Sequence, residues 1–144
     1  MISKACGYGI RGVVYLAEKV NENRNVGIQE IAGALDIPPH YLAKILQDLV
    51  RKKVVGSVKG PNGGVYVREE VLEMPVIDLV ELIDGDAYRT RCFMGMEECS
   101  AEEPCPLHHD FAVLRKGIIE RFSCKKIGDL QSGAGYVLDN FLKA

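Results

Sequence analysis

Apolar side chains recur with helical spacing through the first third of the chain. Residues 3–20 place apolar positions three and four residues apart, which predicts an amphipathic helix. Two shorter stripes with the same spacing follow, on either side of the turn residues 36–39. They consist of Ile28, Ile31, Ala32 and Leu35, and then of Leu42, Ile45, Leu46 and Leu49. Two short amphipathic helices joined by a tight turn are typical of a helix-turn-helix unit.

The pattern changes after the second stripe, at residues 54–67. Two arms rich in β-branched residues flank the segment Gly60-Pro61-Asn62-Gly63-Gly64, which suits the positive φ angles of a hairpin turn. A β-hairpin directly after a helix-turn-helix unit describes a winged helix. In that module the second helix enters the major groove of DNA, while the hairpin lies along the backbone or in the minor groove.

The buried stripe of the second helix leaves the opposite face of that helix for DNA. The predicted DNA-binding residues are Pro39, His40, Tyr41, Ala43, Lys44 and Gln47 of this helix, with Lys59 and Gly60 at the hairpin tip. Residues 37–68 hold six basic side chains against one acidic side chain, and a stretch of that charge suits phosphate. A charged face that only meets solvent would give the same charge balance. The assignment of these residues to DNA binding therefore depends on the winged-helix pattern.

The second half of the chain predicts two more helices, at residues 75–83 and 107–122. The longer one carries a narrow apolar seam, formed by Phe111, Leu114, Ile118 and Phe122. Such a seam suits pairing with a second copy of the helix, or packing on its own subunit. A last apolar stretch covers residues 136–142. The expected fold is mainly α with a small β-hairpin wing: a winged helix-turn-helix domain at 1–73, then a cysteine loop and dimerisation helices at 74–144.

The stretch from Cys92 to His109 gathers three of the five cysteines and two of the three histidines. Six residues separate Cys92 from Cys99, five separate Cys99 from Cys105, and two separate Cys105 from His108. Three thiols and an imidazole are ligands that both zinc and iron–sulfur clusters accept. The gaps are long for ordinary zinc knuckles, so the spacing favours an iron–sulfur cluster. Zinc and redox-active thiols are the alternatives.

Three other candidate ligands are expected to have different roles. His109 points away from its neighbour His108 if a helix begins there, which favours capping or solvent. Cys6 and Cys124 lie far from the loop in sequence, and lone cysteines are usually small packed residues.

Length and composition add limits to this picture. The 144 residues are 47% hydrophobic, carry a net charge of −2 and contain no run near the roughly 18 apolar residues of a membrane span. The first ten residues lack the apolar core of a signal peptide, so we expect a cytoplasmic protein with reduced or metal-bound thiols. No nucleophile–base constellation indicates an enzyme. A small iron–sulfur electron carrier is the alternative class, and the basic helix and hairpin count against it.

The order of these motifs resembles a known group of bacterial regulators. The helix-turn-helix, the wing sequence KGPNGG, the three-cysteine loop and the long helix are similar to the IscR/NsrR group of winged-helix transcriptional regulators, over about residues 2–125. The resemblance implies a homodimer whose long helix crosses between subunits, bound to double-stranded DNA at a pseudo-palindromic operator. It also implies a 2Fe–2S cluster, with 4Fe–4S as the alternative, whose state alters DNA affinity. The matching ligand positions are Cys92, Cys99, Cys105 and His108.

Three departures from the group's pattern bear on these expectations. The gap after Cys92 is one residue longer than the group's usual five. Lys59 stands where the wing signature has arginine, so the bidentate fork of a guanidinium is missing. The nitric-oxide-sensing relatives use an N-terminal carboxylate as a ligand, but residues 5–8 contain no acid here. That favours His108 as the fourth ligand, with a residue of the other subunit as the alternative.

Overall fold

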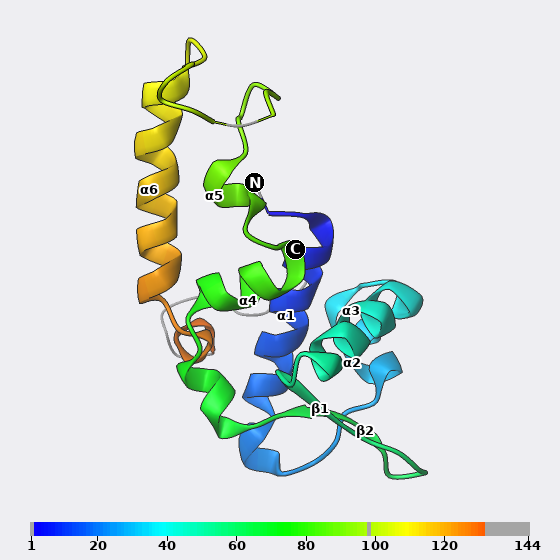
Figure 1. The fold of residues 1–144 in the computed structure, drawn as a ribbon. Coiled ribbons are helices and arrows are strands. Elements are labelled where there is room, and N and C mark those ends of the chain that lie inside the picture. The colour runs from blue at the N-terminus through cyan, green and yellow to red at the C-terminus, as the bar shows by residue number, and fades with distance from the viewer. Residues whose placement is uncertain (1, 98, 132–144) are drawn as a thin grey trace.

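The computed structural model describes residues 2–97 and 99–131. Its helices are α1 (Lys4–Glu18), α2 (Ile28–Leu35), α3 (Pro39–Arg51), α4 (Val76–Asp84), α5 (Ala87–Thr90) and α6 (His108–Cys124). The strands are β1 (Val55–Val58) and β2 (Gly64–Val67), and the 3-10 helices are η1 (Val20–Glu22), η2 (Glu69–Glu73) and η3 (Ile127–Leu130). The mainly helical fold with a two-stranded hairpin confirms the predicted fold class (Figure 1). The apolar stretch at 136–142 lies outside the described residues.

Helix α1 is the element on which α3 and α4 both pack. Ser3 caps its N-terminus, where the hydroxyl oxygen accepts a hydrogen bond from the Cys6 N–H at 2.9 Å. Gly9 lies where the three helices meet, since a Cβ there would stand 2.5 Å from Ile83 Cδ1 and 3.2 Å from Ile45 Cγ2. A glycine weakens an isolated helix, but at this position it allows two other helices to approach closely.

Helices α2 and α3 form the predicted helix-turn-helix unit. Helix α2 ends at Leu35, and Asp36 adopts the left-handed conformation with φ 53°. Pro39 occupies the first turn of α3, where its missing N–H costs no helical hydrogen bond. The predicted stripes face the core, and their fully buried members are Ile31, Leu35, Leu42, Leu46 and Leu49.

The hairpin is antiparallel and is extended on one side by the loop before α2. Val55 pairs with Val67 and Val58 with Gly64 across the two strands. Val26 and Val65 exchange both backbone N–H···O hydrogen bonds, each at 2.9 Å. Gly64 allows this close approach: its φ is 151°, and a Cβ there would lie 2.6 Å from the Val26 carbonyl oxygen. The root of the wing is therefore fastened to the segment that leads into α2.

Alanine at Gly64 is expected to lower the free energy of unfolding by about 2 kcal/mol, because a Cβ would collide with the Val26 backbone in a conformation that favours glycine. Gly33→Ala in α2 is the matched control. Nothing lies within 4 Å of a Cβ at Gly33, so that change should raise stability by up to about 1 kcal/mol. Urea unfolding followed by circular dichroism measures both variants, and equal stabilities would contradict the expectation.

The helices predicted in the second half are α4 and α6, and each lies within two residues of its predicted bounds. Helix α6 packs on α4, but Val113 and Leu114 remain 73% and 58% exposed. Cys124 is exposed, so the prediction that it packs in the core is wrong. The reason is helical phase, since Phe122 packs on the core and a residue two positions later lies about 200° around the helix.

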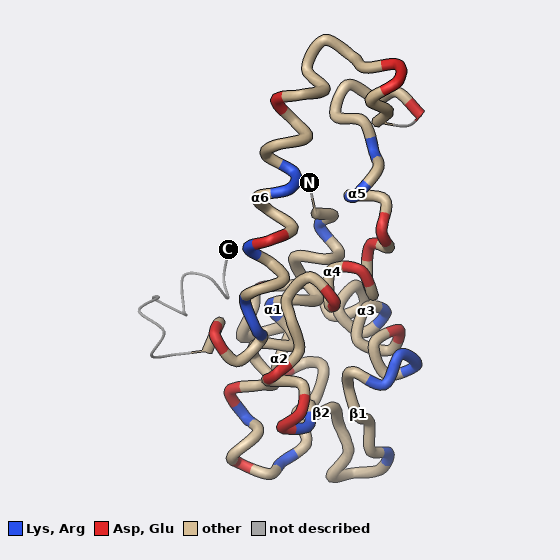
Figure 2. The backbone as a smooth tube through the Cα atoms, turned by 60° about the vertical axis from the view of Figure 1, so that its left-hand side comes forward, with Lys and Arg blue, Asp and Glu red and all other residues tan. Residues whose placement is uncertain are grey.

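One cluster of buried residues joins the two halves of the chain. It includes Val13 and Val14 of α1, Leu79 and Val80 of α4, and Ile127 of η3. The chain after α6 returns to the start of α4, where the Val76 N–H donates to the Lys125 carbonyl oxygen at 2.7 Å. The loop that carries the cysteines and the hairpin lie at opposite ends of the molecule (Figures 1 and 2). Within the described ranges, no helix is both long enough and apolar enough to span a membrane.

Candidate DNA interface and cysteine site

The outward face of α3 presents the residues that the sequence predicted for DNA binding. The exposed ones are Pro39, His40, Tyr41, Lys44 and Gln47, and Ala43 is half-buried. The rings of His40 and Tyr41 lie 4.8 Å apart at the start of the helix, and Tyr41 is 57% exposed. His40, Lys44 and Gln47 are spaced four and three residues apart, so they share one side of α3. The structure brings these polar groups together on one surface.

The hairpin adds a second part to this surface. Lys59 and Gly60 are exposed at its tip. A groove runs between α3 and the hairpin, lined by Gln47, Arg51 and Ser57 together with Lys59. Lys and Arg positions gather at the turn after α3, and Lys59 adds a cation at the hairpin tip (Figure 2). Sequence reasoning counted Arg51 only within the basic stretch 37–68 and did not single out Ser57, although Arg51 follows Gln47 by one helical turn, which could have indicated it as part of the surface.

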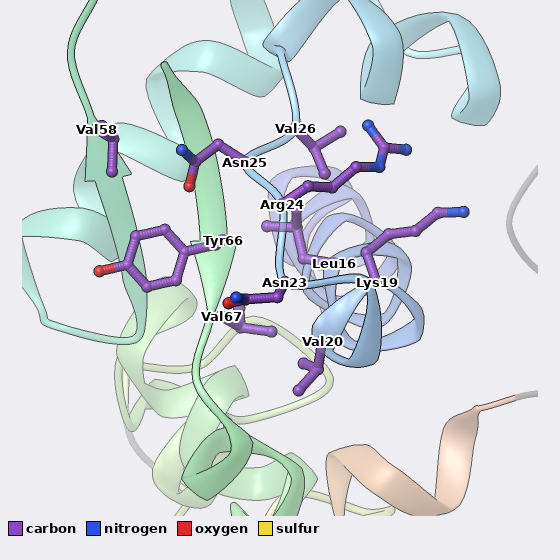
Figure 3. Close-up of a pocket in the computed structure, with 10 residues that line it drawn as sticks. All are labelled: Leu16, Lys19, Val20, Asn23, Arg24, Asn25, Val26, Val58, Tyr66 and Val67. Carbon is purple, nitrogen blue, oxygen red and sulfur yellow. The ribbon is translucent and has the colours of Figure 1, made fainter. Parts of the chain in front are cut away.

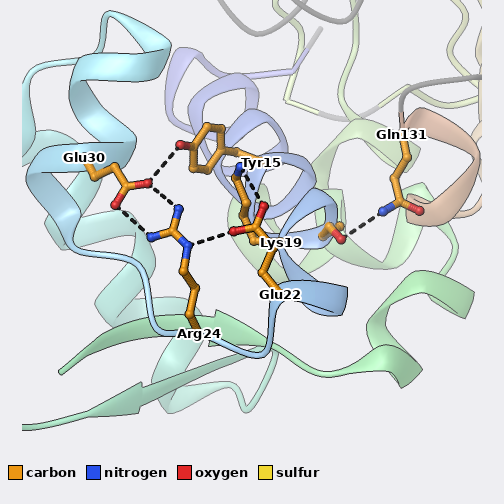
Figure 4. A network of polar contacts seen from close by, with 7 residues as sticks. Tyr15, Lys19, Glu22, Arg24, Glu30 and Gln131 are labelled. Atoms are coloured by element: carbon orange, nitrogen blue, oxygen red, sulfur yellow. Dashed lines mark hydrogen bonds and ion pairs between the residues drawn. The ribbon is translucent and has the colours of Figure 1, made fainter. Parts of the chain in front are cut away.

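A polar network ties the loop before α2 to α1 and α2 (Figure 4). The Arg24 guanidinium donates to both Glu30 oxygens, at 2.7 and 3.1 Å, and to a Glu22 oxygen at 2.8 Å. Lys19 of the α1 C-terminus reaches Glu22 at 3.1 Å, and the Tyr15 hydroxyl donates to Glu30 at 3.3 Å. Hydrogen bonds from Arg24 hold the pKa of the Glu30 carboxyl below its ordinary value. Each pair is exposed and contributes little alone, but together they fix the loop before α2.

Next to this network lies a pocket of about 240 Å³, between the end of α1 and strand β2 (Figure 3). Its cationic side chains are Lys19 and Arg24, and both are paired with carboxylates. Asn25 also lines it and donates from Nδ2 to the Asn62 carbonyl oxygen at 3.2 Å. Lys19 and Arg24 are thus engaged with carboxylates before and on α2, and Asn25 with the hairpin turn, so the polar groups of this pocket hold the surrounding structure.

The four predicted metal ligands form two pairs. The Cys92 and Cys105 sulfur atoms are 3.8 Å apart. The Cys99 sulfur lies 3.2 Å from His108 Nδ1. His108 is the first residue of α6, so the start of that helix brings its imidazole to the loop. Cys92 and His108 are buried, at 4% and 9% exposure, while Cys99 and Cys105 are half-buried.

The surroundings of Cys92 favour its thiolate form. The backbone N–H groups of Met96 and Met94 lower the pKa of the Cys92 thiol, and Cys105 and the Arg115 cation act in the same direction. A thiolate is the form of cysteine that binds metals. Backbone donors around a thiolate are also typical of sites that hold iron–sulfur clusters.

The spacing of each pair suits two ligands of one metal. Two thiolates on a tetrahedral centre, at about 2.3 Å from the metal, stand about 3.8 Å apart. Across residues 2–97 and 99–131, no three Cys, His, Asp or Glu side chains gather where they could hold a single ion. A donor set divided into two pairs fits a group with two metal centres better than a single zinc ion.

The other candidate ligands, Cys6, Cys124 and His109, are not members of these pairs. Cys6 is fully buried in α1, and burial, followed by the Asp84 carboxylate, raises its pKa to about 12. Cys6 is therefore a protonated thiol in the core. Its packing there agrees with the sequence prediction. Cys124 is exposed at the far end of α6. The His109 ring lies edge-on to that of His108, with 5.3 Å between their centroids, and the residue is exposed.

The fold and the α3 surface define a winged-helix DNA-binding protein with a cysteine loop attached. The chain belongs to the Rrf2 family of iron-dependent transcriptional regulators, which matches residues 2–133. A protein of Aquifex aeolicus named as a helix-turn-helix-type transcriptional regulator is 36% identical over 133 residues, which are 90% of each chain. The resemblance to the IscR/NsrR group of transcriptional regulators is confirmed.

Solved structures share the fold. CymR, the global cysteine regulator of B. subtilis, superposes with a TM-score of 0.74 at 21% identity, covering 90% of this chain and 95% of that one. The IscR of T. potens gives a TM-score of 0.68 at 20% identity, covering 90% of this chain and 85% of that one.

Proposed function

We propose that the DNA affinity of this regulator is controlled by a 2Fe–2S cluster whose ligands are Cys92, Cys99, Cys105 and His108. The observation that carries the proposal is the division of these four side chains into two pairs, at 3.8 and 3.2 Å. One pair for each iron satisfies a two-iron cluster, whereas a zinc ion needs all four donors around one point. The iron-dependent character of the family supports the same conclusion.

When bound, such a cluster supplies a redox-active and labile group that responds to iron, oxidants or nitric oxide. Cys92, Cys99, Cys105 and His108 would hold it in a loop away from the DNA-facing surface. We place DNA reading in residues 1–73, and cluster binding with dimerisation in residues 74–144. Within the first part, the outward face of α3 and the tip of the wing would meet the major groove and the phosphate backbone.

The exposed apolar side chains of α6 support a homodimer. Val113 and Leu114 lie on a helix that packs on its own subunit along one side only. Pairing α6 with the α6 of a second copy would cover them. A two-fold dimer presents two α3 helices, so its DNA site is expected to be pseudo-palindromic, with half-sites about one helical turn apart.

The test is purification of the full chain without oxygen, followed by visible absorption and analysis of iron, sulfide and zinc. We expect a coloured protein with equal amounts of iron and sulfide. A colourless preparation with one zinc per chain would refute the cluster. DNA affinity is then compared between cluster-loaded and cluster-free protein on selected duplex sites, and equal affinity at every site would refute the control of DNA binding.

A second candidate function, a thiol switch, is favoured by the contact between Cys92 and Cys105. Their sulfur atoms would have to move from 3.8 Å to about 2.05 Å to form a disulfide. The reaction takes one equivalent of peroxide, which is reduced to two waters as both thiols lose hydrogen. Intact mass of the cluster-free protein under non-reducing conditions, before and after peroxide, tests it. No loss of two hydrogens would exclude this function.

A further inference from the structure

The segment immediately before Cys92 is a single helical turn, α5 (Ala87–Thr90). A helix of this length has almost no stability of its own, because it makes too few internal hydrogen bonds. It nevertheless determines where the cysteine loop begins. Its position must therefore come from contacts with other elements.

Helix α4 holds this turn on one side through Glu81. The Tyr88 hydroxyl and the Arg89 Nε–H both donate to Glu81 Oε1, at 2.5 and 2.9 Å. Helix α4 is itself anchored, because Lys52 at the end of α3 donates to the Leu82 carbonyl oxygen and Ile83 packs beside Gly9. This side of the turn is thus tied to the DNA-binding half.

Helix α6 holds the same turn on the other side through Arg115. The guanidinium donates from Nη1 to the Arg89 carbonyl oxygen at 3.2 Å, and from Nη2 to the Arg91 carbonyl oxygen at 2.7 Å. The carbonyl between them, that of Thr90, accepts from the Cys99 N–H at 2.9 Å. Three successive carbonyls at the end of α5 are therefore all bonded. A cation is favoured there because the C-terminus of a helix carries partial negative charge.

The two contacts of Arg115 require a guanidinium. The carbonyl oxygens of Arg89 and Arg91 are separate acceptors, and a planar fork can reach both with fixed geometry, whereas a lysine offers a single ammonium. Arg115 lies seven residues after His108, two turns further along the same face of α6. Helix α6 thus supplies His108 to one ligand pair and holds the backbone that leads to the other.

We infer that Arg115 is a positioning residue of the cysteine site: it fixes the backbone at Arg89 and Arg91, so that Cys92 is held beside Cys105 and Cys99 beside His108. The inference rests on the proposed function, in which these four residues are the ligands. Arg115 itself binds no metal. Its role is to keep the two pairs at a fixed separation before any cofactor arrives, which lowers the conformational entropy that the loop loses on binding.

The test is hydrogen exchange, followed by mass spectrometry, on the reduced and cluster-free full chain. Arg115→Gln should speed exchange in peptides covering residues 87–99 by about tenfold, the change that charged hydrogen bonds of this kind predict. Arg115→Lys should fall between this variant and the original protein. Lys116→Gln is the matched control, because Lys116 is 79% exposed on the same helix and lies 3.9 Å from Glu120. Unchanged exchange in Arg115→Gln, or equal acceleration in Lys116→Gln, would overturn the inference.

A second measurement distinguishes a role of Arg115 in positioning the four ligands from a role in the stability of the loop alone. In protein loaded with iron and sulfide, the visible absorption of Arg115→Gln should decay in air several times faster than that of the original chain, and Arg115→Lys should recover part of the difference. Equal decay, despite faster exchange, would overturn the positioning role. If the original chain binds no cluster at all, the proposed function fails, and the exchange result still decides whether Arg115 holds the loop.

Discussion

Serine in place of Cys92 is expected to abolish the visible absorption of the anaerobically purified protein, with a loss of cluster affinity on the order of a hundredfold or more. A serine hydroxyl is a harder and less acidic ligand than a thiol, and it binds iron–sulfur clusters poorly. Cys92 is 4% exposed and its sulfur faces that of Cys105, so the change removes one thiol of this buried pair. Absorption and iron content of the purified variant measure the effect.

Cys124→Ser is the matched control for this prediction. Cys124 is an exposed thiol at the far end of α6, so its loss should leave absorption and iron content unchanged. An unaltered cluster in Cys92→Ser would contradict the ligand assignment. His108→Ala then decides the fourth ligand: loss of the cluster supports His108, and retention points to a residue of the other subunit.

Alanine at both Lys44 and Lys59 is expected to weaken duplex binding by on the order of tenfold or more at physiological salt. Each lysine that contacts a phosphate releases about one counterion, so the slope of log affinity against log salt should flatten by about two per protomer. Lys44 lies on the outward face of α3 and Lys59 at the hairpin tip, and both are exposed. Fluorescence anisotropy with a labelled duplex, across a range of salt concentrations, measures both quantities.

The control for the DNA prediction is Lys116→Ala, since Lys116 is exposed on α6, away from α3 and the hairpin. It should change neither the affinity nor the salt slope by a comparable amount. If the double variant bound DNA with an unchanged salt slope, the interface would have to lie elsewhere on the molecule.

The parts of the fold that depend on local pattern could be predicted from the sequence. The stripes that end at Leu35 and Leu49 follow helical periodicity, and the hairpin follows from glycines that supply positive φ, so both appear where expected. The pairing of Val26 with Val65 could not be predicted, because it joins segments that lie far apart in the chain. The turn α5 was missed because four residues carry no periodic signal.

The candidate cysteine site was only partly accessible to sequence reasoning. Spacing identified Cys92, Cys99 and Cys105, but it could not say which sulfur lies beside which donor. That division depends on how the loop folds back onto the start of α6. Arg115 was missed for a related reason: its partners are backbone carbonyls of residues 89 and 91, and these leave no trace in the side-chain pattern.

Helix α1 links the end of α4 to the start of the helix-turn-helix unit. Next to its N-terminus, the Ser3 N–H donates to Asp84 Oδ2 at 2.7 Å, at the end of α4; towards its C-terminus, the Tyr15 hydroxyl donates to Glu30 of α2 at 3.3 Å. Its fifteen residues rise about 22 Å, so a tilt of about 5° at one end displaces the other end by about 2 Å. The helix is in this sense a lever arm. If a group bound at the cysteine loop shifted α4, a small tilt of α1 would carry that shift to α2 and the helix-turn-helix unit.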